Sequence, residues 1–239
     1  MNAGSTIFER DPAKQAVCDA VCAEIDDVLV PHMTRLQSEP DDSTLSHMLH
    51  AGRPEGQPRD IGFVLPSIKV ALIGGLQEPG HGAGSVLAGL LAADQWREVV
   101  ADPALAPKAV DEGIRWVAPI GTQIRTARHD VEIGGTTIPS GAPVAGLLGS
   151  ANRDAEVFDD ADRYDLHRDP QALRRSQAAF GFGKHFCSGH AFARQQIRIA
   201  VEVLAERFPR LAGDPARPPV FRGWELRAPT TLWVRLDAA

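Results

Sequence analysis

The chain has 239 residues, of which 44% are hydrophobic and 23% are charged, as in an ordinary globular protein. The formal net charge is −6 and no cluster of lysine and arginine stands out, which argues against a nucleic-acid partner. Three cysteines cannot all pair within one chain, so the sequence favours a reducing, cytoplasmic compartment.

The sequence also argues against membrane anchoring. The N-terminal residues lack the charged and then apolar pattern of a signal peptide. The longest apolar stretch, residues 70–93, is interrupted by Gln77, Glu78, Pro79 and His81. We therefore expect no membrane partner.

The first predicted element is an amphipathic helix that begins at Asp11-Pro12. An aspartate followed by a proline is typical of a helix start. Apolar residues then recur every four positions, at Val17, Val21, Ile25 and Leu29. Pro31 is expected to end or bend this helix.

Two of the three cysteines, Cys18 and Cys22, lie one turn apart on this predicted helix. They could bind a metal ion as a pair, but no second pair or histidine has suitable spacing. A solvated or half-buried helix face is the favoured interpretation.

The middle of the chain is predicted to be a loop followed by helices. Residues 38–58 are rich in proline, glycine and polar residues, with a short helix over 43–50. A long helical stretch over 67–93, broken near its middle, precedes a helix over 107–117.

The second half combines small β elements with one more long helix. A Gly-Gly turn within residues 131–138 predicts a hairpin. Residues 151–176 are polar and rich in turns, a helix runs from 191 to about 208, and residues 221–236 form a closing strand pair. The sequence predicts one domain over 1–239, mainly α with small β elements.

The stretch from Phe180 to Gly189 is a glycine-rich loop that leads into this last helix, with Cys187 near its end. We expect its three glycines, 181, 183 and 189, to allow φ > 0 and a close approach to a flat partner. The positive end of the helix would stabilise a thiolate, which is a natural axial ligand for haem iron. The alternative is a buried, inert cysteine.

The pattern Phe-x-x-Gly-x-His-x-Cys-x-Gly, followed by Ala193-Arg194, resembles the haem-binding loop of the cytochrome P450 family. The resemblance implies the C-terminal portion of that fold and haem b as the cofactor. It implies that Cys187 is the iron ligand and that the loop residues Phe180, Gly181, Gly183 and Gly189 lie beside the haem.

Glu112 and Arg115 lie three residues apart and can pair on one helix face. Alone this is a weak signal, because such pairs are common on surface helices. The family resemblance extends to residues 158–165 and implies that Arg163 joins the pair in a buried charge network. Such a network has a structural role, since it fixes the segment that carries the cysteine loop.

Two further side chains match haem-propionate ligands of the family. Arg125 precedes the hairpin by the family's interval, and His185 lies two residues before the cysteine. Both can donate to a carboxylate at the edge of a buried macrocycle. The alternatives are that Arg125 is a solvated arginine at a strand edge and that Arg128 takes its place.

The predicted break in the long helix follows Gly75. Pro79 cannot donate to the carbonyl of Gly75, so the helix is expected to open there. The site resembles the family's oxygen-binding groove, with Gln77 and Glu78 in place of its acid and alcohol. The resemblance thus implies catalytic roles for both and a haem contact for Gly75. The alternative is two separate helices with Glu78 merely solvated.

The resemblance implies a monooxygenase that takes electrons from a ferredoxin- or flavin-type donor and oxidises a small organic substrate. Residues 75–79 and 116–121 look most like a bacterial subgroup that includes aromatic O-demethylases. The alternatives are peroxide-driven oxidation and a non-catalytic or vestigial haem-binding protein. Family members carry a long further N-terminal part, so we expect a truncated member.

Overall fold

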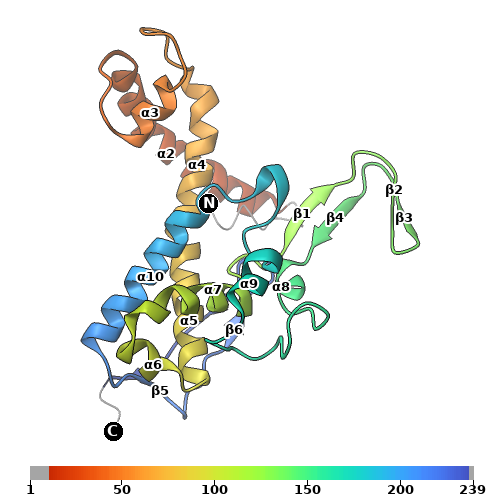
Figure 1. Cartoon of the computed structure of the whole chain (residues 1–239). Helices are drawn as coiled ribbons and strands as arrows, with labels where there is room; N and C mark the ends of the chain where they lie inside the picture. The colour runs from red at the N-terminus through yellow and green to blue at the C-terminus, as the bar shows by residue number, and fades with distance from the viewer. Residues whose placement is uncertain (1–10, 237–239) are drawn as a thin grey trace. The chain divides into compact units, whose positions relative to one another are not determined.

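The computed structural model describes residues 11–236, apart from the side chains of residues 174–176. Contacts divide the chain into two compact units, residues 1–76 and 77–239. Helices dominate both, and the strands form small antiparallel pairs (Figure 1). The predicted fold class is therefore confirmed, whereas a single domain over 1–239 stays a prediction.

Over residues 11–76, the described part of the first unit, the chain forms the helices α2 (Pro12–Ser38), α3 (Thr44–His50) and α4 (Ile61–Leu76). The Asp11 carboxylate accepts a hydrogen bond from the Ala13 N–H at 2.9 Å and caps α2 as predicted. Pro31 does not end α2, which continues to Ser38. Burial of apolar side chains beyond the proline compensates for the missing hydrogen bond, and the core of this unit contains Met33, Leu36, Leu49, Val64 and Ile68.

The two cysteines of α2 face different surroundings: Cys18 is buried and Cys22 is half-buried. Among the residues that the structure describes, no three histidine, cysteine or acidic side chains are grouped to hold a metal ion. The half-buried helix face remains the favoured interpretation of this pair.

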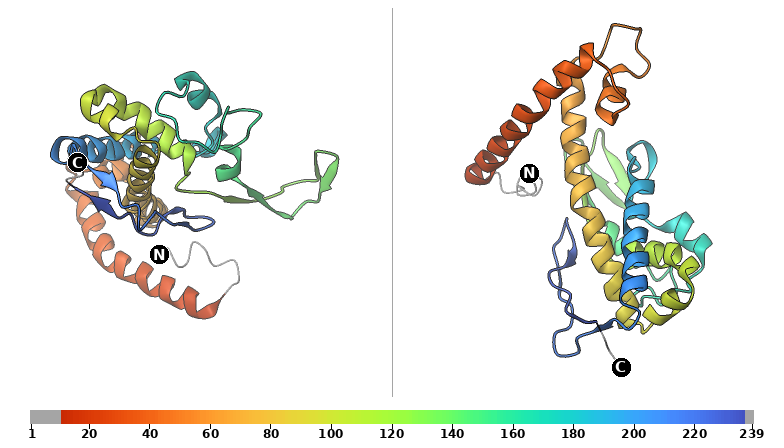
Figure 2. Two further views of the ribbon diagram at one scale, coloured as in Figure 1. Left: turned by 90° about the horizontal axis from the view of Figure 1, so that it is seen from below. Right: turned by 90° about the vertical axis from the view of Figure 1, so that its left-hand side faces the viewer.

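The second unit is built on three helices that pack together, α5 (Glu78–Ala92), α7 (Ala106–Trp116) and α10 (His190–Arg207) (Figures 1 and 2). Its shorter helices are α6 (Trp96–Ala101), η1 (Pro103–Leu105), α8 (Leu148–Ala151), α9 (Pro170–Ser176) and η2 (Gly183–His185). A Cβ on Gly113 would lie 2.8 Å from the Val86 Cα, so glycine allows α7 to approach α5 closely. The core around this contact includes Val86, Leu90, Val110, Ile114, Ile197 and Val201.

The strands between residues 11 and 236 form four separate antiparallel pairs. They are β1 (Gln123–Thr126) with β4 (Pro143–Gly146), β2 (Val131–Ile133) with β3 (Thr136–Ile138), β5 (Ala212–Gly213) with β8 (Val234–Arg235), and β6 (Phe221–Arg222) with β7 (Ala228–Pro229). Gly134 and Gly135 both have positive φ, at 57° and 76°, which suits a two-residue hairpin turn. The hairpin predicted over 131–138 is therefore confirmed.

The predicted break in the long helix is present, but it lies at Gln77. α4 ends at Leu76 and α5 begins at Glu78, so Pro79 is the second residue of the new helix. A proline there loses no intrahelical hydrogen bond, because the first N–H groups of a helix have no partner within it. The break therefore lies between Gly75 and Pro79, as expected, and two residues before the proline itself.

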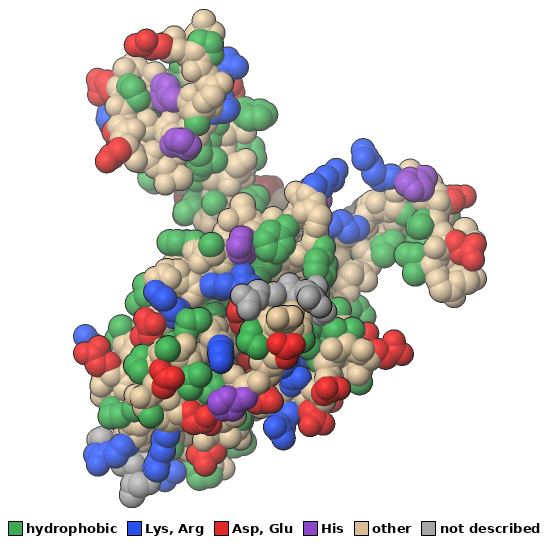
Figure 3. Space-filling view, viewed as in Figure 1, with side chains coloured by type: hydrophobic (Ala, Val, Ile, Leu, Met, Phe, Trp, Pro, Cys, Tyr) green, Lys and Arg blue, Asp and Glu red, His purple; other side chains and the backbone are tan. Residues whose placement is uncertain are grey.

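By length and composition alone, residues 61–92, which contain α4 and α5, could cross a membrane, with a mean hydropathy of 1.3 over a window of 18 residues. One such segment among the described residues is weak evidence, because core helices of water-soluble proteins can pass the same test. On the face of the second unit seen in Figure 3, side chains of both charge signs are interspersed. The absence of membrane and nucleic-acid partners stays a prediction.

Candidate functional site

The cysteine loop, residues 180–189, joins α9 to α10. Gly181 and Gly183 have φ of 68° and 67°, the left-handed conformation that favours glycine. Gly189 differs from the expectation: its φ is −86° and it is the N-cap of α10. Two of the three glycines therefore give the loop its backbone conformation, and the third begins the helix.

Hydrogen bonds on both sides hold the backbone of Cys187, while its side chain is exposed. The Cys187 N–H donates to the Phe180 carbonyl at 3.0 Å, and the His190 N–H donates to the Cys187 carbonyl at 3.3 Å. Phe182 and Phe186 are also exposed, at 63% and 46% of their surface. An exposed thiol beside exposed aromatic rings contradicts the alternative of a buried, inert cysteine.

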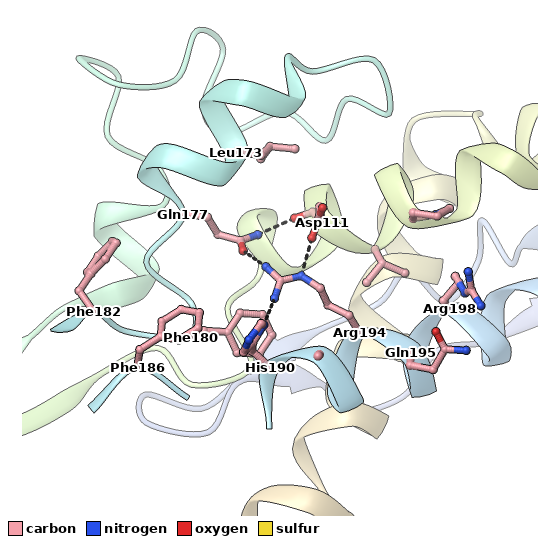
Figure 4. Close-up of a pocket in the computed structure, with 13 residues that line it drawn as sticks. Asp111, Leu173, Gln177, Phe180, Phe182, Phe186, His190, Arg194, Gln195 and Arg198 are labelled. Carbon is pink, nitrogen blue, oxygen red and sulfur yellow. Dashed lines mark hydrogen bonds and ion pairs between the residues drawn. The ribbon is translucent and has the colours of Figure 1, made fainter. Parts of the chain in front are cut away.

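Behind this loop, Arg194 of α10 lies in a cavity of about 710 Å³ (Figure 4). Its Nε donates to Asp111 Oδ1 of α7 at 2.8 Å, and its Nη2 donates to Gln177 Oε1 at 3.2 Å. The guanidinium carbon lies 4.4 Å from the centre of the Phe180 ring. Arg194 and these three partners thus link α7, the end of α9, the cysteine loop and α10.

The start of α5 carries three polar side chains with buried atoms that have no hydrogen-bond partner among the residues that the structure describes. These atoms are Gln77 Oε1, Glu78 Oε2 and His81 Nδ1. Buried polar atoms are normally paired, so unpaired ones mark a position for a ligand or water. Burial raises the pKa of Glu78, and a backbone hydrogen bond and the nearby His81 partly oppose this change.

The raised pKa of Glu78 predicts a pH-dependent stability. An acid whose pKa is higher in the folded chain lowers the free energy of unfolding as pH rises above its ordinary value of 4.5. We expect Glu78→Gln to raise the melting temperature at pH 7 and to lose this advantage below pH 4.5. Thermal melts at both pH values test this, and an equal advantage at both would exclude a titrating carboxylate as the cause.

Helix packing places the start of α5 and the cysteine loop at the same end of the second unit. A Cβ on Gly82 would lie 2.5 Å from Ile197 Cδ1, so α5 and α10 touch there. Both helices begin at the same end in two different views (Figures 1 and 2). Glu78 lies one turn before Gly82, on the side toward the start of both helices. Gly75 belongs to the first unit, and its contact with a haem stays a prediction.

The two predicted propionate donors are both exposed. Arg125 lies on β1, where its Nη1 donates to Gln123 Oε1 at 3.1 Å and to the Ile124 carbonyl at 2.8 Å. His185 ends the short helix η2 inside the cysteine loop. Their roles, and the alternative role of Arg128, stay predictions.

The donor set of the second unit fits a haem. An accessible thiol can bind iron, and the open space around Gly183, where an added Cβ would meet no atom within 4 Å, leaves room beside the loop. The unpaired atoms of Gln77 and Glu78 are suited to hold water or a proton.

A buried ion-pair network lies between α7 and the segment that follows α8. Glu112 and Arg115 are fully buried, and Arg115 donates Nε to Glu112 Oε2 at 2.7 Å and Nη2 to Oε1 at 2.8 Å. Arg115 also donates to the backbone carbonyls of Asn152, Ala161 and Arg163. The predicted pair is therefore a buried structural anchor and not a surface decoration.

The third side chain of this network is Arg168, and the prediction of Arg163 was wrong. Arg168 Nε lies 3.1 Å from Glu112 Oε2, and its side chain is 8% exposed. Arg163 contributes its carbonyl alone, while its side chain is 68% exposed. Both arginines lie in the same turn-rich segment, and only its folded path shows which side chain points inward.

Comparison with known families now adds to this geometry. The family model described as Cytochrome P450 matches residues 100–224, which include α7 and the cysteine loop. The chain belongs to the cytochrome P450 family. Members of this family bind haem b, iron protoporphyrin IX, which agrees with the donor set around Cys187.

Named relatives and a solved structure of P450 enzymes cover much of the chain. The steroid C26-monooxygenase of Mycolicibacterium smegmatis is 35% identical over 195 residues, covering 79% of this chain and 47% of that protein. The 6-deoxyerythronolide B hydroxylase of Saccharopolyspora erythraea is 34% identical, covering 98% and 57%. The structure of cytochrome P450 TbtJ1 is 30% identical with a TM-score of 0.84, covering 94% and 59%.

This P450 chain thus spans about half the length of the curated relatives it matches. By their names, these relatives oxidise a steroid and 6-deoxyerythronolide B. They do not support the narrower expectation of the aromatic O-demethylase subgroup, which rested on two short sequence stretches. Substrate pockets diverge more readily than the cysteine loop, so such stretches identify a subgroup poorly.

Proposed function

We propose that this P450 chain is the haem-binding part of a haem-thiolate monooxygenase that acts on a small organic molecule. The observation that carries the proposal is the exposed thiol of Cys187, whose backbone is held on both sides in the family's loop. When bound, haem b supplies the oxygen-activating chemistry.

Each residue of the site then has a role. Cys187 binds the iron, and the loop packs beside the haem through Phe180, Gly181, Gly183 and Gly189. Arg125 and His185 donate hydrogen bonds to the propionates, and Gly75 is a haem contact, since a residue without a side chain leaves room for the macrocycle. Gln77 orients a water molecule, and Glu78 exchanges a proton with it.

The source of electrons and the substrate belong to the same proposal. A ferredoxin- or flavin-type donor in the cytoplasm would supply electrons. The substrate test should include a steroid and a macrolactone, by analogy with the relatives, and an aromatic methoxy compound, the class that the sequence suggested. Binding of each to the haem-loaded chain can be followed by the shift of its Soret band.

A second candidate function is peroxide-driven oxidation, and Glu78 is the observation that favours it. A half-buried carboxyl with a raised pKa retains a proton to higher pH and can exchange it with hydrogen peroxide. Turnover with peroxide alone would support this candidate, and turnover only with a reductase system would support the monooxygenase. Haem binding with neither would leave the non-catalytic alternative.

The role of Cys187 can be tested on the whole chain loaded with haem. We expect the reduced carbon-monoxide complex to show the red-shifted Soret band of thiolate ligation, and Cys187→Ser to lose it. The matched controls Cys18→Ser and Cys22→Ser should keep it, because both residues lie on α2, outside the cysteine loop. Retention of the band in Cys187→Ser would mean that another cysteine binds the iron.

A further inference from the structure

Arg194 contacts both residues that hold the backbone of Cys187. Its guanidinium stacks on the ring of Phe180, whose carbonyl accepts the Cys187 N–H. Its Nη1 lies 3.2 Å from Nδ1 of His190, whose N–H donates to the Cys187 carbonyl. One side chain thus contacts the two ends of the loop that presents the thiol (Figure 4).

Arg194 is itself fixed to the helical core. Asp111 of α7 accepts from Nε at 2.8 Å, and Gln177 accepts from Nη2 at 3.2 Å. The Gln177 amide in turn donates to the Asp111 carbonyl at 2.7 Å. A planar guanidinium can make these hydrogen bonds and stack on an aromatic ring at the same time, which an ammonium group cannot do.

The two rings that Arg194 contacts also support each other. The Phe180 and His190 rings meet edge to face at 6.1 Å, and the Phe186 ring lies 4.7 Å from that of His190. Because Phe180, Phe186 and His190 all belong to the loop or to the first residue of α10, their packing fixes the loop and not the helices alone. Arg194 joins this aromatic cluster to Asp111 on α7.

We propose that Arg194, anchored by Asp111, is a positioning residue for Cys187. It holds Phe180 and His190, and these hold the cysteine backbone so that the thiol is presented at a fixed place. The importance of this position for iron binding rests on the proposed function. The hydrogen bonds and ring contacts that define it are features of the haem-free chain.

The first test is amide hydrogen exchange in the haem-free, full-length chain. We expect Arg194→Gln to speed exchange in peptides covering residues 180–190 by about fivefold or more. The reason is that Arg194 no longer holds Phe180, whose carbonyl accepts the hydrogen bond of the Cys187 N–H. Exchange in α5 and α7 should change much less. Arg194→Lys should recover only part of the protection, since it keeps the charge but loses the planar stacking.

Arg198 provides a matched control on the same helix. It lies one turn beyond Arg194 and lines the same cavity, but its ion pair is with Glu202 at 3.5 Å. Arg198→Gln should leave exchange over 180–190 at the wild-type rate. Equal exchange rates over residues 180–190 in Arg194→Gln and the wild type would overturn the proposal. An equal increase of that exchange rate in Arg194→Gln and Arg198→Gln would overturn it as well.

A second readout uses the haem-loaded chain. Arg194→Gln should shift part of the reduced carbon-monoxide complex from the thiolate band to a band without thiolate ligation, and Arg198→Gln should not.

If Arg194→Gln does not fold, Asp111→Asn weakens the same anchor more mildly and is tested in the same way. If Cys187→Ser keeps the thiolate band while exchange still rises in Arg194→Gln, the proposed iron ligand is wrong and the positioning of the loop stands.

Discussion

Glu112→Ala is expected to destabilise the folded chain by about 3–5 kcal/mol, because it removes the carboxylate that balances the charge of the fully buried Arg115. A loss of this size is a large part of the free energy of unfolding of a typical domain, about 5–15 kcal/mol. Urea unfolding followed by circular dichroism measures the change directly.

The two arginines of the turn-rich segment provide the control for this prediction. Arg168→Ala should also destabilise strongly, because its nearly buried side chain reaches Glu112 at 3.1 Å. Arg163→Ala should cost no more than about 1 kcal/mol, since its exposed side chain makes one distant ion pair, at 3.9 Å with Asp165. A larger cost for Arg163→Ala than for Arg168→Ala would contradict the network as described.

Glu78→Gln is expected to slow oxidation by the haem-loaded chain by about 10²–10⁴-fold, the usual contribution of a general acid–base group. The variant keeps the size and polarity of the side chain but cannot exchange the proton. Haem content and the Soret band should stay as in the wild type. Initial rates of substrate oxidation with peroxide, at equal haem concentration, measure the effect.

Glu225 supplies a control of similar chemistry. It is also half-buried, has an unpaired Oε2 and has a pKa raised by burial, but it follows β6 near the end of the chain. Glu225→Gln should leave the rate of oxidation unchanged. Wild-type rates in Glu78→Gln would mean that solvent delivers the proton by another route, and Glu78 would then have no catalytic role.

Local sequence signals predicted the elements of the fold well. The Asp11 cap, the Gly-Gly hairpin turn and the proline-led helix of Glu112 depend on interactions within a few residues, and the structure contains all three. The cysteine loop could be predicted equally well from the sequence, because its glycines, histidine and cysteine follow one another along ten residues. Most of the family resemblance lies in this loop.

The sequence by itself thus determined the family, the mainly helical fold, the cofactor class and Cys187 as the candidate ligand. Tertiary structure alone decided that Arg168 and not Arg163 completes the buried network, and that Arg194 reaches Asp111 and Phe180. These partners are separated by up to 83 residues, and their pairing depends on how helices pack. Spacing along a chain specifies which residues share a helix face, but it does not specify which distant side chain that face will meet.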